Sequence, residues 1–289
     1  MVTSRQSAAP SPTMEQFQSI PTHLRAEPFV KWAGGKKRLL PAFDSLLPTR
    51  FESYIEPFLG GGAMFIYLAS IGRISSGVLS DVNGELIHLY RSVRDDVERL
   101  IAELETYPYD HDFYYELRSK DPHELSDIAR AARMLYLNRT CFNGLYRVNR
   151  QGQFNVPIGR YESPVICNAP VLRNVSRLLQ GMELQRWGFE TTIELARPGD
   201  FIYLDPPSGS LVAVGEEDDE ELVFDAADDE RLFELYQALH KRGCKVLMSH
   251  KATPAVRQRY SRFEVRDLRI AGVKRERGRT GDIAIRNYF

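Results

Sequence analysis

Short apolar segments alternate with longer amphipathic ones along most of the chain. SYIEPF, SGVLSD, DFIYLD and CKVLMSH are continuous apolar runs rich in β-branched and aromatic residues, and a turn or an amphipathic segment follows each of them. Runs of this length that are apolar on both faces are typical of buried strands in a parallel sheet. The intervening segments predict helices on both faces of that sheet, so the pattern indicates an α/β fold.

A long stretch after the second apolar run has a helical pattern. Residues 85 to about 135 carry apolar residues at helical spacing, first in ELIHLYRSVRDDVERLIAELETY and again in LSDIARAARMLYL. The run YRVNRQGQFNV then predicts two short strands around NRQGQ, a hairpin able to enter a nucleic-acid groove.

The N-terminal segment has no such pattern. Residues 1–25 are rich in Ser, Pro, Thr, Ala and Gln without sustained periodicity, and we expect a flexible tail there.

Composition bounds the class of protein. A chain of 289 residues with 43% hydrophobic content suits one substantial α/β domain with an insertion, or two small domains. Its net charge of −1 gives no whole-chain preference for a polyanion. The three cysteines, Cys141, Cys167 and Cys244, form no CxxC pair, which favours reduced thiols over a disulfide scaffold or zinc site. No apolar run approaches the roughly 18 residues that span a bilayer, so we expect a cytoplasmic protein without metal or membrane partner.

Local charge is less even. Residues 128–161 hold six arginines and no acidic residue, interleaved with Tyr, Phe and Asn. A solvated basic face would also look like this, but the mixture of arginine, aromatic and amide side chains favours a nucleic-acid partner. These arginines are Arg130, Arg133, Arg139, Arg147, Arg150 and Arg160.

A glycine turn in YIEPFLGGGAMF suggests a place for a cofactor. Gly60, Gly61 and Gly62 carry no side chain, so a ligand can lie against their backbone between a strand and a helix. The turn is not a GxGxxG fingerprint, which makes a dinucleotide the weaker reading. Asp81, 19 residues after Gly62, ends GVLSD where a carboxylate can accept the hydroxyls of a ribose. Together they indicate a nucleoside-containing cofactor, the alternative being an ordinary turn and helix cap.

The tripeptide Asp205-Pro206-Pro207 suggests the chemistry. The exocyclic amine of adenine or cytosine is a poor nucleophile because its lone pair is delocalised into the ring. A carboxylate that accepts one amine hydrogen, with the Pro206 carbonyl accepting the other, would draw the nitrogen toward tetrahedral geometry and aim its lone pair at a methyl group. A strand that simply stops at two prolines is the alternative.

Several motifs together resemble one family. FVKWAGGKKRLLP, YIEPFLGGGA, SDVNGELI, YLNRTCFNGLYRVNRQGQFNVPIGRY, PGDFIYLDPP and DIAIRNY occur in the order seen in the Dam family, D12-class DNA adenine-N6 methyltransferases, over about residues 28–289. The resemblance implies a Rossmann-like methyltransferase sheet, S-adenosylmethionine as cofactor and double-stranded DNA as partner. It also implies a catalytic domain at 26–84 and 165–289, interrupted by a mainly helical target-recognition domain with a hairpin at 85–164. We expect a monomer.

The resemblance assigns roles residue by residue. The catalytic set is Asp205, Pro206, Pro207 and Ser208. The cofactor set is Trp32, Lys36, Glu56, Pro57, Phe58, Gly60, Asp81, Phe189 and Asp205. The DNA-binding set is Phe142, Asn143, Leu145, Arg147, Asn149, Arg150, Pro157, Arg160 and Tyr161. The target adenine must leave the helix, because its amine is otherwise paired and out of reach of the methyl donor.

The chain also departs from the family pattern. Ser208 stands where the family has an aromatic residue that stacks on the flipped base, a contact worth about 1–3 kcal/mol. Gly188 stands where the family has an acid that contacts the adenine of the cofactor. Residues 216–230 include ten acidic residues and no basic one, and Phe224 among them is a candidate to replace the missing ring.

These features predict an adenine-N6 methyltransferase with GATC as the expected site. Two alternatives stay open. A catalytically weak or inert DNA-binding relative would keep the recognition segment without the chemistry. An N4-cytosine methyltransferase would use the same Asp-Pro-Pro geometry on a different amine.

Overall fold

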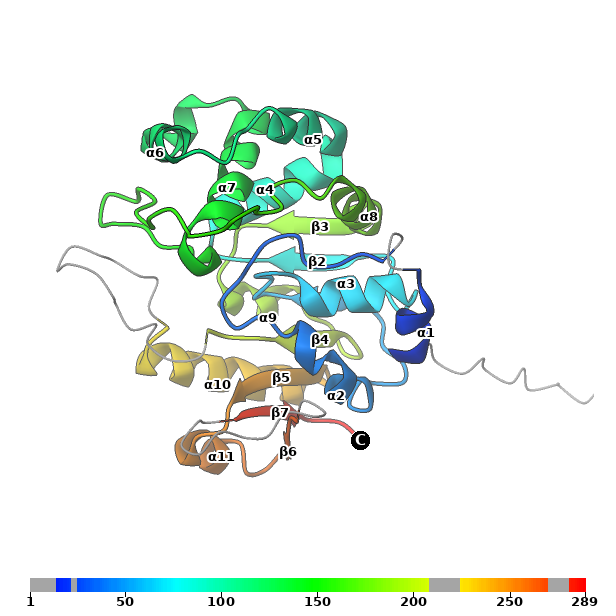
Figure 1. Ribbon diagram of the computed structural model, residues 1–289. Helices are drawn as coiled ribbons and strands as arrows, with labels where there is room; N and C mark the ends of the chain where they lie inside the picture. Colours follow the sequence, from blue (N-terminus) through cyan, green and yellow to red (C-terminus); the bar gives the residue numbers. More distant parts are fainter. Residues whose placement is uncertain (1–13, 22–24, 208–223, 270–280) are drawn as a thin grey trace, which may run out of the picture.

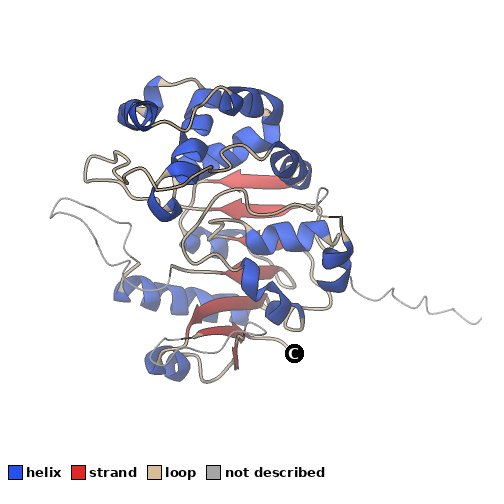
Figure 2. Ribbon diagram, in the orientation of Figure 1, coloured by secondary structure: helices blue, strands red, loops and turns tan. Residues whose placement is uncertain are grey.

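The computed structural model describes residues 14–21, 25–207, 224–269 and 281–289. In these residues the strands form one seven-stranded sheet in the order β3-β2-β1-β4-β5-β7-β6, with helices on both faces (Figures 1 and 2). β1 to β5 run parallel, and β7 is antiparallel to both β5 and β6. The α/β fold is therefore confirmed. The strands are β1 (Tyr54–Glu56), β2 (Gly77–Ser80), β3 (Met182–Gln185), β4 (Phe201–Leu204), β5 (Lys245–Lys251), β6 (Glu264–Asp267) and β7 (Asp282–Arg286).

The central strands are apolar throughout because both of their faces are covered. Tyr203 and Leu247 point to one face of the sheet, and their chain neighbours Ile202 and Val246 point to the other. The first face packs against α2 and α3, and the second against α10 and α11. The helices are α1 (Met14–Ser19), α2 (Leu40–Asp44), α3 (Ala63–Ser70), α4 (Gly84–Asp95), α5 (Val97–Glu105), α6 (His111–Ser119), α7 (Asp127–Thr140), α8 (Ala169–Leu179), α9 (Thr192–Leu195), α10 (Ala226–Arg242) and α11 (Pro254–Arg259).

The helical pattern from residue 85 to about 135 is confirmed by α4 to α7, which gather beyond the β3 edge of the sheet (Figure 1). Side chains before these helices cap their first turns. Asn83 Oδ1 accepts from Leu86 N at 3.0 Å, and Asp110 Oδ1 accepts from Phe113 N at 2.9 Å. α7 contacts both α4 and α5, and its buried side chains join the same apolar cluster as the α3 face of the sheet. The helical region is thus packed continuously onto the sheet.

The expected hairpin forms, but without two regular strands. Val148 and Phe154 make an isolated antiparallel bridge, and Asn149 N donates to Gln153 O at 2.9 Å. The prediction of two strands is wrong because the ladder ends after this bridge. Side chains complete the turn instead: Asn149 Oδ1 accepts from the backbone N–H of both Gln151 and Gln153.

The boundary of the predicted tail at residue 25 is also wrong. Residues Met14–Ser19 form α1, and its Phe17 is only 8% exposed. The Phe17 ring lies 5.3 Å from that of Tyr67, with the Arg25 guanidinium 5.4 Å from it. One buried aromatic on a six-residue helix is too short a signal for periodicity to reveal. Residues 1–13 and 22–24 lie outside the described residues.

No helix in the described parts of the chain has both the length and the apolar character needed to cross a membrane.

Candidate active site

Three acidic residues that the sequence indicated lie at the carboxyl ends of inner strands of the sheet. Glu56 ends β1, Asp81 follows β2 and Asp205 follows β4. The strand order reverses at β1, with β2 on one side and β4 on the other, and ligands of open α/β sheets bind beyond the carboxyl ends of strands at such a point. The fold therefore places these three carboxyl groups where a ligand is expected.

Two side chains hold the carboxylate of Asp205. The ammonium of Lys36, a buried residue just before the short helix η2 (Lys37–Leu39), lies 2.7 Å from Asp205 Oδ1. The Ser249 hydroxyl on β5 donates to the same oxygen. Burial raises the pKa of Asp205, while Lys36 and Ser249 oppose that rise because both stabilise the charged form.

Glu56 points into the protein. Its Oε2 accepts from the Tyr54 hydroxyl at 2.7 Å and from Phe65 N, in the first turn of α3, at 3.1 Å. Burial raises the pKa of Glu56 to about 8, with a further contribution from the negative charge of Asp205, although the Tyr54 hydrogen bond opposes the shift. The raised pKa favours the protonated form of Glu56 at neutral pH, and its hydrogen bonds tie β1 to α3.

The glycine turn packs directly on Trp32. Gly60 has a φ of +45°, and a Cβ built on it would lie 2.8 Å from Trp32 Cδ1, so no other residue fits without displacement. Gly60 N donates to Asp81 Oδ2 at 3.0 Å, and Asn83 N donates to Asp81 Oδ1 at 2.9 Å. Burial raises the pKa of Asp81 against these two bonds. The turn and the carboxylate expected to hold a ribose are thereby joined.

Three phenylalanine rings form a cluster beside this turn. Phe58 and Phe189 are stacked, with ring centroids 5.4 Å apart and planes inclined by 25°. Phe224 lies 6.0 Å from Phe189 and 6.1 Å from Phe58. Phe224, considered above as a substitute for the missing stacking residue, thus packs with the rings expected around the cofactor. Ser208 and residues 216–223 of the acidic stretch lie outside the described residues.

A second carboxylate lies beside Gly188. A Cβ built on Gly188 would be 2.7 Å from Glu190 Oε2, so the Glu190 carboxylate occupies the space into which a side chain at 188 would point. Glu190 also pairs with Arg231 on α10 at 3.1 Å.

Comparison with known proteins agrees with this geometry. Residues 32–270 match the model of the D12 class N6 adenine-specific DNA methyltransferases. The chain belongs to this family. It is 34% identical over 293 residues to the type II methyltransferase M1.LlaDCHI of Lactococcus lactis subsp. cremoris, covering 95% of this chain and 99% of the relative. It is 36% identical over 250 residues to the type II methyltransferase M.MjaIII of Methanocaldococcus jannaschii, covering 78% and 85%. It is 31% identical over 248 residues to the DNA adenine methylase of Escherichia coli K12, covering 84% and 87%.

The family implies S-adenosylmethionine as the methyl donor of this methyltransferase, and the residues present suit such a group. The turn at Gly60 leaves no room for a Cβ, the Asp81 carboxylate is fixed beside it, and a stacked aromatic pair lies close by. Bare backbone, a carboxylate and a ring face are the features that a nucleoside requires.

In the segment expected to read DNA, some side chains are exposed, and others are partly buried or hydrogen-bonded within the protein. Phe142 is 50% exposed, and Asn143 beside it has a φ of +55°, in the left-handed region. Arg150, Pro157 and Arg160 are also exposed, whereas Leu145 is half-buried against the core.

Other members of that set make contacts within the protein. Asn149 organises the hairpin turn through its side-chain oxygen and donates to Gln153 Oε1 at 3.0 Å. Arg147 Nε donates to Asn155 Oδ1 at 2.8 Å. The Tyr161 hydroxyl donates to Cys141 O at 3.0 Å, and the Lys31 ammonium lies 4.0 Å from the Tyr161 ring centroid.

The arginines of α7 make hydrogen bonds and ion pairs within the protein. Arg133 is buried and donates to Leu117 O and Arg118 O at 2.9 and 2.7 Å, which fastens the end of α6 to α7. Arg130 pairs with Glu85 on α4, and Arg139 Nε donates to Val165 O at 2.8 Å. The arginine-rich set therefore divides into three residues on α7, of which Arg133 is buried, and three in and after the hairpin.

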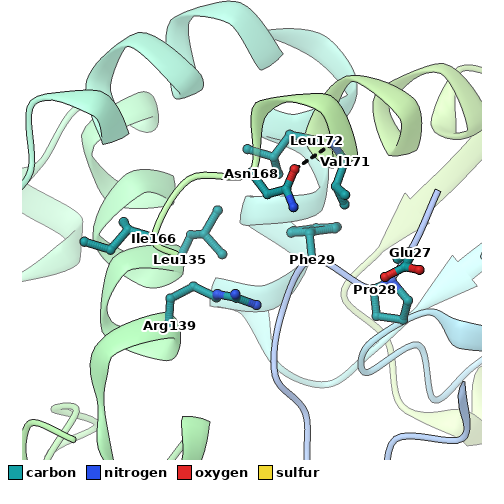
Figure 3. Close-up of a pocket in the computed structure, with 9 residues that line it drawn as sticks. All are labelled: Glu27, Pro28, Phe29, Leu135, Arg139, Ile166, Asn168, Val171 and Leu172. Atoms are coloured by element: carbon teal, nitrogen blue, oxygen red, sulfur yellow. Dashed lines mark hydrogen bonds between the residues drawn. The ribbon is translucent and has the colours of Figure 1, made fainter. Parts of the chain in front are cut away.

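A cavity between α7, the start of α8 and the segment Glu27–Phe29 lies apart from these acids (Figure 3). Arg139 and Asn168 lie on either side of the Phe29 ring, and Asn168 Oδ1 accepts from Val171 N at 3.3 Å. No residue that lines this cavity belongs to the predicted catalytic, cofactor or DNA-binding sets.

The sequence did not indicate Ser249 as a site residue. The only signal is a serine and a histidine at the end of the otherwise apolar run CKVLMSH, which gives no indication of the partner.

Proposed function

We propose that this methyltransferase transfers a methyl group from S-adenosylmethionine to N6 of an adenine that has been turned out of duplex DNA, with GATC as the preferred site. The observation that most supports this function is the way in which the Asp205 carboxylate is held and exposed. Its Oδ1 is held by Lys36 and Ser249, and the side chain keeps 19% of its surface exposed beside the carboxyl ends of β1 and β4. A carboxylate fixed in this way is prepared to accept an amine hydrogen.

The reaction requires little from the protein beyond orientation. Asp205 accepts one N6–H of adenine and the carbonyl of Pro206 accepts the other, which directs the nitrogen lone pair outward. Pro207 restricts the turn that presents this carbonyl. The cofactor supplies an electrophilic methyl group bonded to a sulfonium. Bound in this way, it would give up that methyl group to the nitrogen that Asp205 and the Pro206 carbonyl orient, with S-adenosylhomocysteine as the second product, and one N6 proton would pass to solvent.

The cofactor is assigned to the residues around the glycine turn. Asp81 accepts the ribose hydroxyls, Phe58 and Phe189 contact the adenine ring, and the backbone at Gly60 contacts the remainder. Trp32 packs against the turn at Gly60, and Pro57, three residues before Gly60, is buried. Lys36 pairs with Asp205, and Glu56 binds the first turn of α3, which follows the glycine turn.

DNA is assigned to residues 85–164, as a target-recognition domain. The exposed Phe142 and Asn143 are suited to enter the helix beside the target, and Arg147 and Arg150 are suited to contact bases and phosphates from the hairpin. Leu145, Asn149, Pro157, Arg160 and Tyr161 complete the surface that we assign to DNA. Because the amine of a paired adenine is out of reach, the base must be turned out of the stack.

Product analysis tests this function. The protein is incubated with radiolabelled S-adenosylmethionine and duplexes that contain GATC, a scrambled site or only G·C pairs, and the digested nucleosides are separated. We expect label in N6-methyladenine, with GATC duplexes labelled fastest. Label in N4-methylcytosine would overturn the choice of base, and equal labelling of both adenine-containing duplexes would overturn GATC.

No label in any duplex at saturating cofactor would favour an inert DNA-binding relative. Ser208→Tyr restores the aromatic residue of the family pattern and separates the causes. Activity gained by that variant would assign the defect to the missing ring.

A further inference from the structure

A buried hydroxyl lies near the carboxyl end of the central strand β5. Ser249 is fully buried (0% exposed), and it follows the apolar residues Val246, Leu247 and Met248. Its hydroxyl donates to Asp205 Oδ1 and accepts a long hydrogen bond, 3.4 Å, from the Tyr203 hydroxyl on β4. A polar group so enclosed needs partners, and the one that it donates to is the carboxylate assigned to the reaction.

Strand register brings these groups together. Leu204 on β4 pairs with Met248 on β5 in the parallel sheet, so the next residues along, Asp205 and Ser249, are adjacent. Side chains alternate along a strand, and Tyr203 therefore shares its face with Asp205 and Ser249. On its other side, Ser249 pairs with Ala284 of β7. The position of the Ser249 hydroxyl is therefore fixed by β5, which pairs with β4 on one side and with β7 on the other.

The two oxygens of Asp205 are not equivalent. Lys36 and Ser249 both bind Oδ1. Within the described ranges, Oδ2 takes part in no hydrogen bond or ion pair. A carboxylate held by one oxygen at the end of a short side chain loses its freedom to rotate, so the direction of the other oxygen is set.

We propose that Ser249 is a positioning residue for methyl transfer. It orients Asp205 by holding Oδ1, and this leaves Oδ2 aimed at the amine of the target base. The inference rests on the proposed function, in which Asp205 accepts the amine hydrogen. Ser249 itself does not contact substrate; it acts through Asp205.

The charged and titratable groups around Asp205 define what the loss of Ser249 changes. Lys36 stabilises the carboxylate, whereas Asp282 on β7 raises its pKa and Glu56 on β1 lies close enough to interact with it. Tyr203 adds a buried hydroxyl from β4. Removal of the Ser249 hydrogen bond, which favours the charged form, will raise the pKa of Asp205 further.

The test compares Ser249→Ala with Ser249→Cys and with Tyr203→Phe. Tyr203→Phe is the matched control, because it removes a buried hydroxyl from the same face whose contact with this group is only the long, 3.4 Å bond to Ser249. We expect Ser249→Ala to lower kcat about 10- to 100-fold, as a small misplacement of a reacting group does, with KM for cofactor and DNA changed less than about threefold. Ser249→Cys, a weaker donor of similar size, should be intermediate, and Tyr203→Phe close to wild type.

A second readout does not depend on turnover. Carbon NMR of the aspartate carboxyl groups, with the Asp205 signal assigned from Asp205→Asn, gives the pKa of Asp205 in the protein without DNA. We expect a higher pKa in Ser249→Ala than in the wild type and in Tyr203→Phe. Ser249→Cys replaces Ser249→Ala in both measurements if the alanine variant does not fold.

The outcomes separate the two proposals. An active wild type, with kcat and the Asp205 titration unchanged in Ser249→Ala, overturns the role of Ser249 and leaves the proposed function standing. Equal losses in Ser249→Ala and Tyr203→Phe also overturn it, because a general effect of buried hydroxyls would then be sufficient. A wild type that labels no duplex overturns the proposed function, and the inference falls with it.

Discussion

At the scale of single residues, the site combines carboxyl groups that the fold treats differently. Asp81 and Asp205 are held by hydrogen-bond donors that favour the charged form, and each keeps part of its surface exposed. Glu56, four residues before Gly60 in the chain, is buried, and its pKa is raised to about 8. Burial thus separates a structural carboxyl group from the two that we propose to face ligands.

Asp81→Ala is expected to weaken the binding of S-adenosylmethionine by about tenfold or more, because one or two charge-assisted hydrogen bonds to the ribose are lost. Isothermal titration calorimetry measures this directly. Asp112→Ala, at an exposed acid on α6, is the control and should bind like the wild type. An unchanged affinity in Asp81→Ala would remove Asp81 from the cofactor site.

Glu56 predicts a pH dependence of stability with a definite sign. Its pKa is raised from 4.5 to about 8 in the folded protein, so between these values the folded state binds a proton that the unfolded state releases. The free energy of unfolding therefore falls as the pH rises through this window, and the loss stops above about pH 8.

Glu56→Gln keeps the shape of the side chain without a titrating proton. Urea unfolding at pH 5 and pH 8 should show a smaller loss of stability with pH in this variant than in the wild type. The same pH dependence in both proteins would mean that Glu56 is ionised in the fold.

At the scale of elements, the apolar runs predicted β1, β2, β4 and β5, because strands buried on both faces carry a continuous signal. β3 was not predicted. Its sequence MELQ alternates buried and exposed residues over one short strand at the sheet edge, which is a weak pattern. The site shows the same division: Asp81 and Asp205 follow predicted strands, whereas the bond from Ser249 to Asp205 joins residues 44 positions apart through register alone.

The arginines show that a cluster of positive charge in the sequence does not by itself identify a DNA-binding surface, because one of its members, Arg133, is buried. Arg150→Ala in the hairpin is expected to weaken binding to all duplexes and to reduce the salt dependence of binding, because a phosphate contact is lost. Arg133→Ala on α7 should leave the salt dependence unchanged. It should instead lower the free energy of unfolding by about 2–4 kcal/mol, because two carbonyls of α6 lose their donor.

Fluorescence anisotropy at several salt concentrations and urea unfolding distinguish these two variants. A salt slope reduced equally in both would place Arg133 at the DNA after all. Arg147→Ala, measured on duplexes that differ at one base pair, should relax the preference at that position, and a uniform loss would reassign Arg147 to a phosphate.

At the scale of the whole molecule, one apolar cluster runs from α3 and the sheet into α4, α5 and α7. The segment assigned to DNA therefore has a firm attachment to the strands that end at Asp81 and Asp205. Such packing suits a reaction that depends on holding a base, a methyl donor and a carboxylate in one arrangement.

The central claim is that Asp205 activates the amine of the target base, and single-turnover methyl transfer by Asp205→Ala tests it most directly. With cofactor and GATC duplex both saturating, we expect no detectable transfer, while calorimetry and anisotropy show cofactor and DNA bound within about threefold of wild type. Transfer by Asp205→Ala at the wild-type rate would contradict the account.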